Sequence, residues 1–324
     1  MNERARWGID GFELGLALGG ASSPGEWQRD LALVDRAEAL GLHSVWVPEM
    51  HFARGVTASP LIALGAFAAR TERVRLATTS LLLPIHEPLR LADEIAALDR
   101  ASRGRAIIGL GRGFRAPLFR AFGVDPKTKR DRFDAALDAI LAAWRDGAEG
   151  AVRAPWQRPH PPLAVAAFGP KGLAQAARRG LPYLPSPLEG PRRLAENLER
   201  WRAGLPGGDD VSDRVVPVMR TVHAAADPRE AADVLAALDA QERSLRSQGG
   251  RTPRAIAGAV QEDLRERVVV GTLPEVIDRL GALRDQLGID LLIVRAQVPV
   301  GGADGAAHQE SLQRLAEEVW PAVR

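Results

Sequence analysis

The chain has 324 residues, of which 46% are hydrophobic and 26% are charged, a composition ordinary for a soluble globular protein. Its 43 basic and 41 acidic residues give a net charge of only +2 without a long run of one sign, so the charge pattern does not call for a nucleic acid as partner. Cysteine is absent, which excludes disulfides and cysteine-ligated metals, and since no long apolar run or signal-peptide pattern occurs, we expect a cytoplasmic protein that does not contact a membrane.

In the first third of the chain, short apolar runs alternate with stretches of helical periodicity. The clearest helix start is at Ser59, which can serve as N-cap, followed by Pro60 at the first helical position. The predicted strands of this part are 12–18, 43–49, 74–80 and 105–111, and the predicted helices are 23–41, 59–71 and 86–104.

The alternation continues less regularly in the remainder. Thr272 and Glu275 have the spacing of a capping box, which predicts the start of a helix over 271–288. The predicted strands are 163–169, 181–186, 213–225 and 289–297, and the predicted helices are 131–147, 170–180, 191–204, 227–247, 271–288 and 309–323.

Eight strands with helices between them predict an α/β protein. Nearly continuous apolar strands are typical of a parallel sheet that is covered on both faces, and eight such units favour one (β/α)8 TIM barrel domain over residues 1–324. A doubly wound sheet is the competing arrangement. The segments 111–130 and 248–270 are expected to be irregular insertions in the βα loops that act as lids over the site.

The site of such a barrel lies at the carboxyl ends of its strands. There the sequence places Arg112, whose guanidinium can hold a phosphate through two hydrogen bonds, and a helix start with Gly169 and Gly172, whose N–H groups can bind an anion. The small residues 77–80 would allow a flat ligand to approach the backbone. The glycines around Arg112 do not fit G-x-G-x-x-G, and no metal-binding motif is present, so the residues point to a phosphorylated planar cofactor.

Several long motifs resemble the bacterial luciferase-like flavin monooxygenases. They are "VWVPEMHF", "LPIHEPLRLADEIAALDRASRGRAIIGLGRG", "FRAFGVD" and "VVVGTLPEVIDRL", and the likeness is densest over 43–147. The resemblance implies a (β/α)8 barrel, a homodimer, and binding of reduced FMN or, in one branch, of the deazaflavin F420. Most FMN members of the family react with O2.

Carried over to this sequence, the resemblance implies a set of cofactor-binding residues. Thr79 and Ser80 match a non-prolyl cis peptide behind the flavin ring. The phosphate would be bound by Arg112, by the backbone beside Phe114, by Arg130, and by the loop with Phe168, Gly169 and Gly172. Luciferases have a carboxylate and a serine where this chain has Phe168 and Gly169, so the backbone alone would bind the phosphate at this loop.

The sequence also departs from the luciferase pattern at "EMHF". Met50 stands where luciferases keep their catalytic histidine, so light emission is not expected, and His51 and Glu49 become the catalytic candidates. Each also has a structural interpretation, His51 as a residue that shapes the pocket and Glu49 as an ion-pair partner. Trp46 and Phe52 are expected in the core, and His86 at the start of the next helix.

These features predict an FMN-dependent oxidoreductase, a monooxygenase that uses O2 on an organic substrate whose identity the sequence does not reveal. Because no NAD fingerprint is present, the reduced FMN would be a co-substrate supplied by a separate flavin reductase. The alternatives are an F420-dependent hydride-transfer enzyme and a flavin-binding protein without catalysis.

Overall fold

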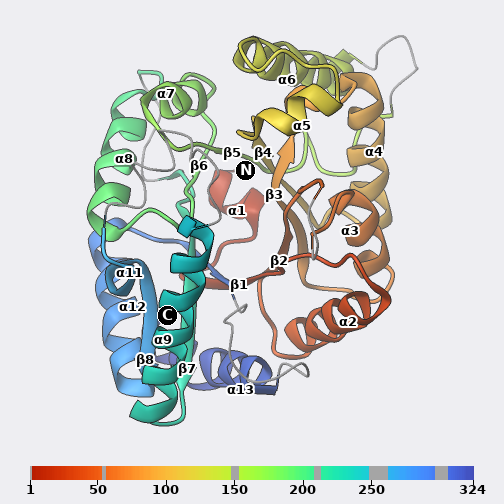
Figure 1. Ribbon diagram of the computed structural model, residues 1–324. Coiled ribbons are helices and arrows are strands. Elements are labelled where there is room, and N and C mark those ends of the chain that lie inside the picture. The colour runs from red at the N-terminus through yellow and green to blue at the C-terminus, as the bar shows by residue number, and fades with distance from the viewer. Residues whose placement is uncertain (1, 53–55, 147–152, 208–212, 248–261, 296–305) are drawn as a thin grey trace. The chain divides into compact units, whose positions relative to one another are not determined.

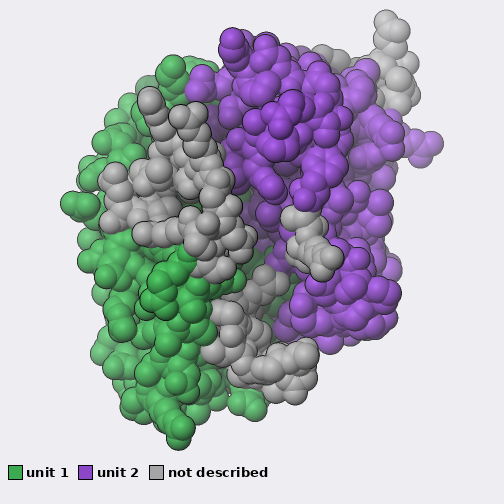
Figure 2. Space-filling view, in the orientation of Figure 1, with its two compact units in different colours: residues 1–18, 39–43, 167–324 green, residues 19–38, 44–166 purple. Residues whose placement is uncertain are grey.

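The computed structural model describes residues 2–52, 56–146, 153–207, 213–247, 262–295 and 306–324. The chain forms two compact units, which Figure 2 distinguishes by colour. Unit 1 comprises residues 1–18, 39–43 and 167–324, and unit 2 comprises residues 19–38 and 44–166.

Unit 2 contains a parallel sheet whose strands follow the chain order β2-β3-β4-β5 (Figure 1). The strands are β2 (Ser44–Val47), β3 (Arg75–Leu82), β4 (Ala106–Gly111) and β5 (Leu163–Ala166). The helices are α2 (Pro24–Ala39), α3 (Pro60–Ala68), α4 (Pro88–Ala101), α5 (Ala116–Ala121) and α6 (Lys129–Asp146), and the 3-10 turn η1 spans Leu83–Ile85.

The helix α4 shows how the sequence specifies these elements. The Glu87 side chain accepts hydrogen bonds from the N–H groups of Leu89 and Arg90, and Pro88 occupies the first turn, where its missing N–H is not needed. The face that includes Leu91, Ala92, Ile95 and Leu98 is buried, which is the periodicity of an amphipathic helix. Ser59 does precede α3 as predicted, although its side chain makes no capping hydrogen bond.

Unit 1 contains a second set of parallel strands, in the order β1-β9-β7-β8. Its strands are β1 (Glu13–Ala17), β6 (Tyr183–Leu184), β7 (Pro217–Ala225), β8 (Val268–Thr272) and β9 (Leu291–Arg295). Its helices are α1 (Glu3–Trp7), α7 (Pro170–Arg178), α8 (Pro191–Ala203), α9 (Pro228–Ser247), α11 (Leu264–Arg267), α12 (Leu273–Leu287), α13 (Ala306–Arg314), the π-helix η4 (Leu315–Val319) and α14 (Trp320–Val323).

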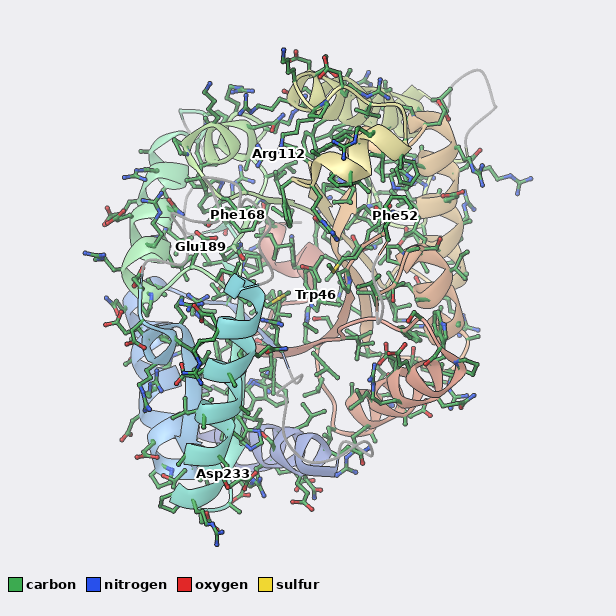
Figure 3. The ribbon with its side chains drawn as sticks, viewed as in Figure 1. Trp46, Phe52, Arg112, Phe168, Glu189 and Asp233 are labelled. Carbon is green, nitrogen blue, oxygen red and sulfur yellow. The ribbon has the colours of Figure 1, made fainter. Side chains whose placement is uncertain are left out.

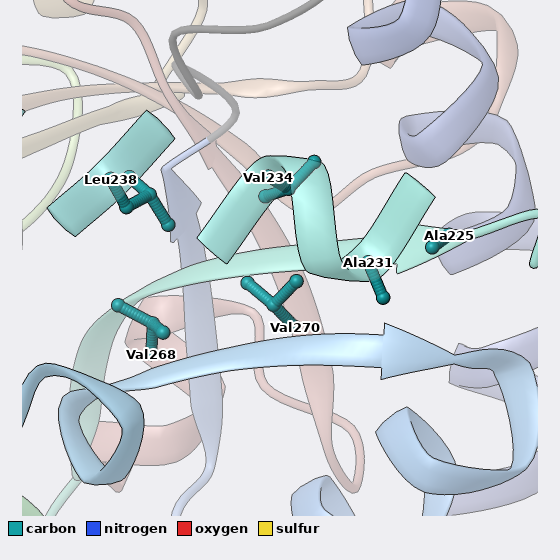
Figure 4. Packing of buried hydrophobic residues seen from close by; sticks show 6 residues of the cluster. All are labelled: Ala225, Ala231, Val234, Leu238, Val268 and Val270. Carbon is teal, nitrogen blue, oxygen red and sulfur yellow. The ribbon is translucent and has the colours of Figure 1, made fainter. Parts of the chain in front are cut away.

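The packing of α9 on β7 and β8 is shown in Figure 4. The buried side chains of this contact are Ala225, Ala231, Val234, Leu238, Val268 and Val270. The capping box predicted for α12 is confirmed, since the Glu275 carboxylate accepts hydrogen bonds from both the N–H and the hydroxyl of Thr272, at 2.7 and 2.8 Å. This helix ends at Gly288, whose left-handed φ of 64° suits glycine.

The insertions at 111–130 and 248–270 stay predictions, but neither segment is irregular throughout. Within 111–130, between β4 and α6, the chain forms the short helix α5. Within 248–270 it forms α11 and then most of β8, a ninth strand, because the valines from 268 to 270 pair with β7; residues 248–261 lie outside the described part of the chain. In the portions that the structure covers, no helix combines the length and the apolar character needed to cross a membrane.

Candidate functional site

The buried carboxylate of Glu49, just after β2, joins three segments of unit 2. It accepts hydrogen bonds from the Leu82 N–H at 2.6 Å, from Nε2 of His51 at 2.8 Å and from Nε2 of His86 at 2.9 Å. An ionised carboxylate only accepts, so in each ring Nε2 carries the hydrogen and Nδ1 is the basic nitrogen. Although burial opposes the charge, the hydrogen bonds from His86, Leu82 and His51 hold the pKa of Glu49 below its ordinary value.

The ring of His51 lies among aromatic side chains. The Phe122 ring meets it edge-on with 5.0 Å between centroids, and the Phe52 ring is 5.7 Å away. Trp46 is buried as predicted, and its Nε1–H donates to the Ser44 hydroxyl at 2.8 Å. Phe52, labelled in Figure 3, is 65% exposed, so its predicted place in the core is wrong. Its backbone has a φ of 60°, in the left-handed region.

At the carboxyl end of β3, the structure contains the predicted non-prolyl cis peptide between Thr79 and Ser80. The register between β3 and β4 shifts at this point, between Thr79 and Leu81. The neighbouring residue on β4 is Gly111, where an added Cβ would lie 2.1 Å from the Ser80 hydroxyl oxygen. Only glycine therefore fits at position 111 without moving Ser80.

Three cations gather where β4 ends and α6 begins, and we call Arg112, Lys129 and Arg130 the cation cluster (Figure 3 labels Arg112). Arg112 donates to the carbonyl of Ala166 at 3.3 Å, and Lys129 donates to the carbonyl of Gly113 at 3.3 Å.

The charges of the cation cluster repel one another. Burial first, and then the charge of Arg130, lowers the pKa of Arg112, while Asp134 opposes this effect. Burial and the charges of Arg112 and Arg130 lower the pKa of Lys129 in the same way. A bound anion would relieve this repulsion, and a phosphate dianion suits a cluster of three cations.

Three of the remaining predicted residues, Phe168, Gly169 and Gly172, belong to unit 1. Gly169 is the N-cap of α7, and its carbonyl accepts hydrogen bonds from the N–H groups of Gly172 at 2.8 Å and Leu173 at 3.0 Å. The prediction of a free N–H at Gly172 is therefore wrong, because a bond of the 3-10 type closes the first turn of the helix. Phe168, labelled in Figure 3, precedes this turn and is partly exposed.

The structure brings Glu49 together with His51, the two catalytic candidates, and Arg112 together with Arg130, two of the predicted phosphate-binding residues. Phe114 is 46% exposed beyond β4. Sequence reasoning missed Lys129, although the basic run 127–130 before a helix was a usable signal. It also placed His86 at a helix start, whereas α4 begins at Pro88 and the His86 ring binds Glu49.

The sequence profile of the luciferase-like monooxygenase family matches residues 13–291. The chain therefore belongs to this family and is an enzyme of the flavin-dependent oxidoreductase class.

Two curated relatives illustrate the match. The oxygenase component of the flavin-dependent trigonelline monooxygenase of Acinetobacter baylyi is 27% identical over 90% of this chain and 88% of its own. An uncharacterized protein of Sinorhizobium fredii, y4wF, is 33% identical over 163 residues, and the match covers 46% of this chain and about half (48%) of that protein.

Solved structures give the same fold. The monooxygenase RslO1 of Streptomyces bottropensis has a TM-score of 0.77 at 26% identity over 97% of this chain and 100% of its own. The oxygenating constituent of 3,6-diketocamphane monooxygenase of Pseudomonas putida, solved with FMN, has a TM-score of 0.81 at 21% identity over 97% and 99% of the two chains. The F420-dependent tetrahydromethanopterin reductase of Methanopyrus kandleri has a TM-score of 0.70 at 18% identity over 97% and 100%. The chain thus has the α/β fold of the luciferase-like (β/α)8 barrels, as the sequence predicts.

Proposed function

We propose that this protein is the oxygenase of a two-component system, which binds reduced FMN and uses O2 to oxygenate an organic substrate. The observation that carries the choice of FMN is the cation cluster, because its three mutually repelling cations suit the phosphate monoester of that cofactor. When bound, the reduced flavin would supply the electrons that activate O2.

Each part of the site would have a separate task in holding this cofactor. Arg112, Lys129 and Arg130 would bind the phosphate, beside the backbone at Phe114. The Thr79–Ser80 peptide would lie behind the flavin ring, where Gly111 leaves no Cβ in the way. The backbone contact at Phe168 and Gly169 stays an expectation from the family resemblance.

The proton chemistry would belong to His51, with Glu49 as its positioning residue. Since the Glu49 carboxylate fixes Nε2–H of His51, the Nδ1 atom is the one that can accept or return a proton. The His51 side chain is 13% exposed, so it remains accessible from one side, while the aromatic rings around it limit the access of water.

We further propose that a separate reductase supplies the reduced flavin, that the enzyme is a cytoplasmic homodimer, and that residues 1–324 form one domain. The name of the trigonelline relative, an oxygenase component, supports the first point. The resemblance to the luciferase-like family supports the dimer.

The same experiment tests two alternatives. F420-dependent hydride transfer is represented among enzymes of similar fold. A flavin-binding protein without catalysis is the second alternative, because Met50 stands in place of the luciferase histidine. The purified protein would be titrated with FMN, riboflavin and F420. Photoreduced FMN would then be mixed with air, while O2 uptake and the return of oxidised flavin are recorded together.

We expect FMN to bind more tightly than riboflavin and F420, and the return of oxidised flavin to lag behind O2 uptake. Tight binding of F420 with weak binding of FMN would favour hydride transfer. If FMN binds but the reduced flavin is reoxidised by O2 with the same time course as free reduced FMN, the result would favour the non-catalytic protein.

A further inference from the structure

His86 lines a groove between α3 and α4 of unit 2 (Figure 1). The groove has a volume of about 640 Å³, and most of its lining is apolar, with Leu61, Ile85 and Leu98 among the side chains. Volumes of roughly 300–1,000 Å³ are typical of sites that admit small molecules. The His86 side chain is 28% exposed, so a small molecule in this groove can reach its ring.

The same ring is a donor that both oxygens of Glu49 share. Nε2 of His86 lies 2.9 Å from Oε1 and 3.0 Å from Oε2, whereas His51 donates to Oε1 and the Leu82 N–H donates to Oε2. Burial of Glu49 favours the neutral carboxyl and so raises its pKa. Several hydrogen bonds outweigh this effect and lower the pKa of Glu49, and the hydrogen bond from His86 contributes most. His86 is therefore the main group that keeps Glu49 ionised.

The ionisation state of Glu49 determines which nitrogen of His51 carries the hydrogen. An ionised carboxylate can only accept, so it holds the hydrogen on Nε2 of His51 and leaves Nδ1 as the basic atom. If Glu49 takes up a proton from solvent, its O–H donates to Nε2, and the neutral ring of His51 carries its hydrogen on Nδ1 instead. Loss of the His86 hydrogen bond favours this second state, because the buried charge then has fewer donors.

We propose that His86 is a positioning residue of the candidate site, which acts through Glu49 to fix His51 in the tautomer whose Nδ1 can accept a proton. The inference rests on the proposed function, in which His51 exchanges protons, and it adds to that site a residue that lines a separate groove. A small N–H donor that enters the groove should be able to replace the His86 ring.

The tautomer of His51 can be measured without flavin or substrate. Protein with isotopically labelled histidine nitrogens would be studied by proton–nitrogen correlation NMR at neutral pH, and the signals lost in His51→Gln would assign the His51 ring. His86→Phe keeps an aromatic ring without a donor, whereas His86→Gln keeps an N–H donor. Arg90→Gln is the matched control, because Arg90 lines the same groove and pairs with Glu94 at 2.9 Å. Circular dichroism and thermal melting would establish that every variant is folded.

We expect the wild type and Arg90→Gln to carry the His51 hydrogen on Nε2. In His86→Phe the ratio of the two tautomers should shift towards Nδ1–H by roughly tenfold or more, which corresponds to the loss of one charge-assisted hydrogen bond. His86→Gln should reverse most of this shift. An unchanged tautomer in a folded His86→Phe variant, or an equal shift in His86→Gln, would overturn the inference.

Chemical rescue tests whether the groove gives access to this position. His86→Ala would be titrated with pyrazole, which has an N–H donor, and with 1-methylpyrazole, which has none; both compounds are neutral at neutral pH. Pyrazole should return the His51 hydrogen to Nε2 and 1-methylpyrazole should not, and equal effects of the two compounds, or no effect of pyrazole, would count against the inference. Because no flavin takes part in these measurements, a protein that failed to bind FMN would refute the proposed function and leave the tautomer result standing.

Discussion

Replacing Arg112 by alanine should weaken FMN binding through the phosphate alone. The guanidinium is partly buried at the end of β4, where it donates to the Ala166 carbonyl at 3.3 Å. Its planar fork of N–H donors suits the oxygens of a phosphate. A charge-assisted hydrogen bond contributes about 1.5–3 kcal/mol. At 1.4 kcal/mol per factor of ten, this corresponds to a roughly 10- to 150-fold increase of the dissociation constant.

The assay is a fluorescence titration of FMN and riboflavin, which differ by the phosphate. Arg112→Ala should lose affinity for FMN and leave riboflavin unchanged, so that the preference for FMN over riboflavin shrinks by the same factor. Arg120→Ala is the matched control, because this arginine is exposed on the nearby α5 and lies outside the cation cluster. Equal losses for the two flavins, or an unchanged FMN affinity, would refute the assignment of Arg112 to the phosphate.

Three further predictions concern other residues of unit 2. Lys129→Met should raise the thermal midpoint of the flavin-free protein, since it removes a positive charge that burial and the charges of Arg112 and Arg130 disfavour. The same variant should bind FMN about tenfold more weakly. A lower thermal midpoint would contradict the repulsion within the cation cluster. Glu49→Gln should lower the free energy of unfolding by about 2–3 kcal/mol near neutral pH and slow turnover more than it weakens flavin binding. The pKa of Glu49 is lowered in the folded state, so its contribution to stability is complete above the ordinary carboxyl pKa and is lost as the pH falls through the folded-state pKa. The difference in the free energy of unfolding between variant and wild type should therefore shrink in acid. A difference that urea melts find to be independent of pH would argue against this. Gly111→Ala should cost about 1–3 kcal/mol through its clash with Ser80, whereas the control Gly65→Ala, with no atom within 4 Å of the new methyl, should stabilise the protein by about 0.5–1 kcal/mol.

The sequence was sufficient to predict most of the fold, because its signals are local. Each predicted strand has a counterpart in the structure, and the apolar runs agree with strands that are buried along most of their length. The strand β8 was missed because it leads directly into the capping box of α12, with no turn residues between the strand and the helix, so its valines were taken for the end of a loop.

The site was only partly predictable for a similar reason. Arg112 follows a strand directly and is visible in the sequence, but Lys129 reaches the Gly113 carbonyl from 16 residues further along the chain. His86 lies 37 residues from Glu49, and only the folded strands β2 and β3 bring the two together. Phe52 was expected in the core because aromatic side chains are usually buried. Its left-handed backbone conformation cannot be predicted from the residue type.

The carboxylate of Glu49 has a mechanical consequence for the segments that follow β2 and β3. A single buried carboxylate, which accepts hydrogen bonds from three residues, connects these segments to one another. Dissolved ions screen exposed charges well and buried charges poorly, so raising the ionic strength should leave these hydrogen bonds intact. Thermal melts at neutral pH should therefore show no loss of the Glu49 contribution to stability when the salt concentration is raised. The connection between the two segments is sensitive to acid and insensitive to salt.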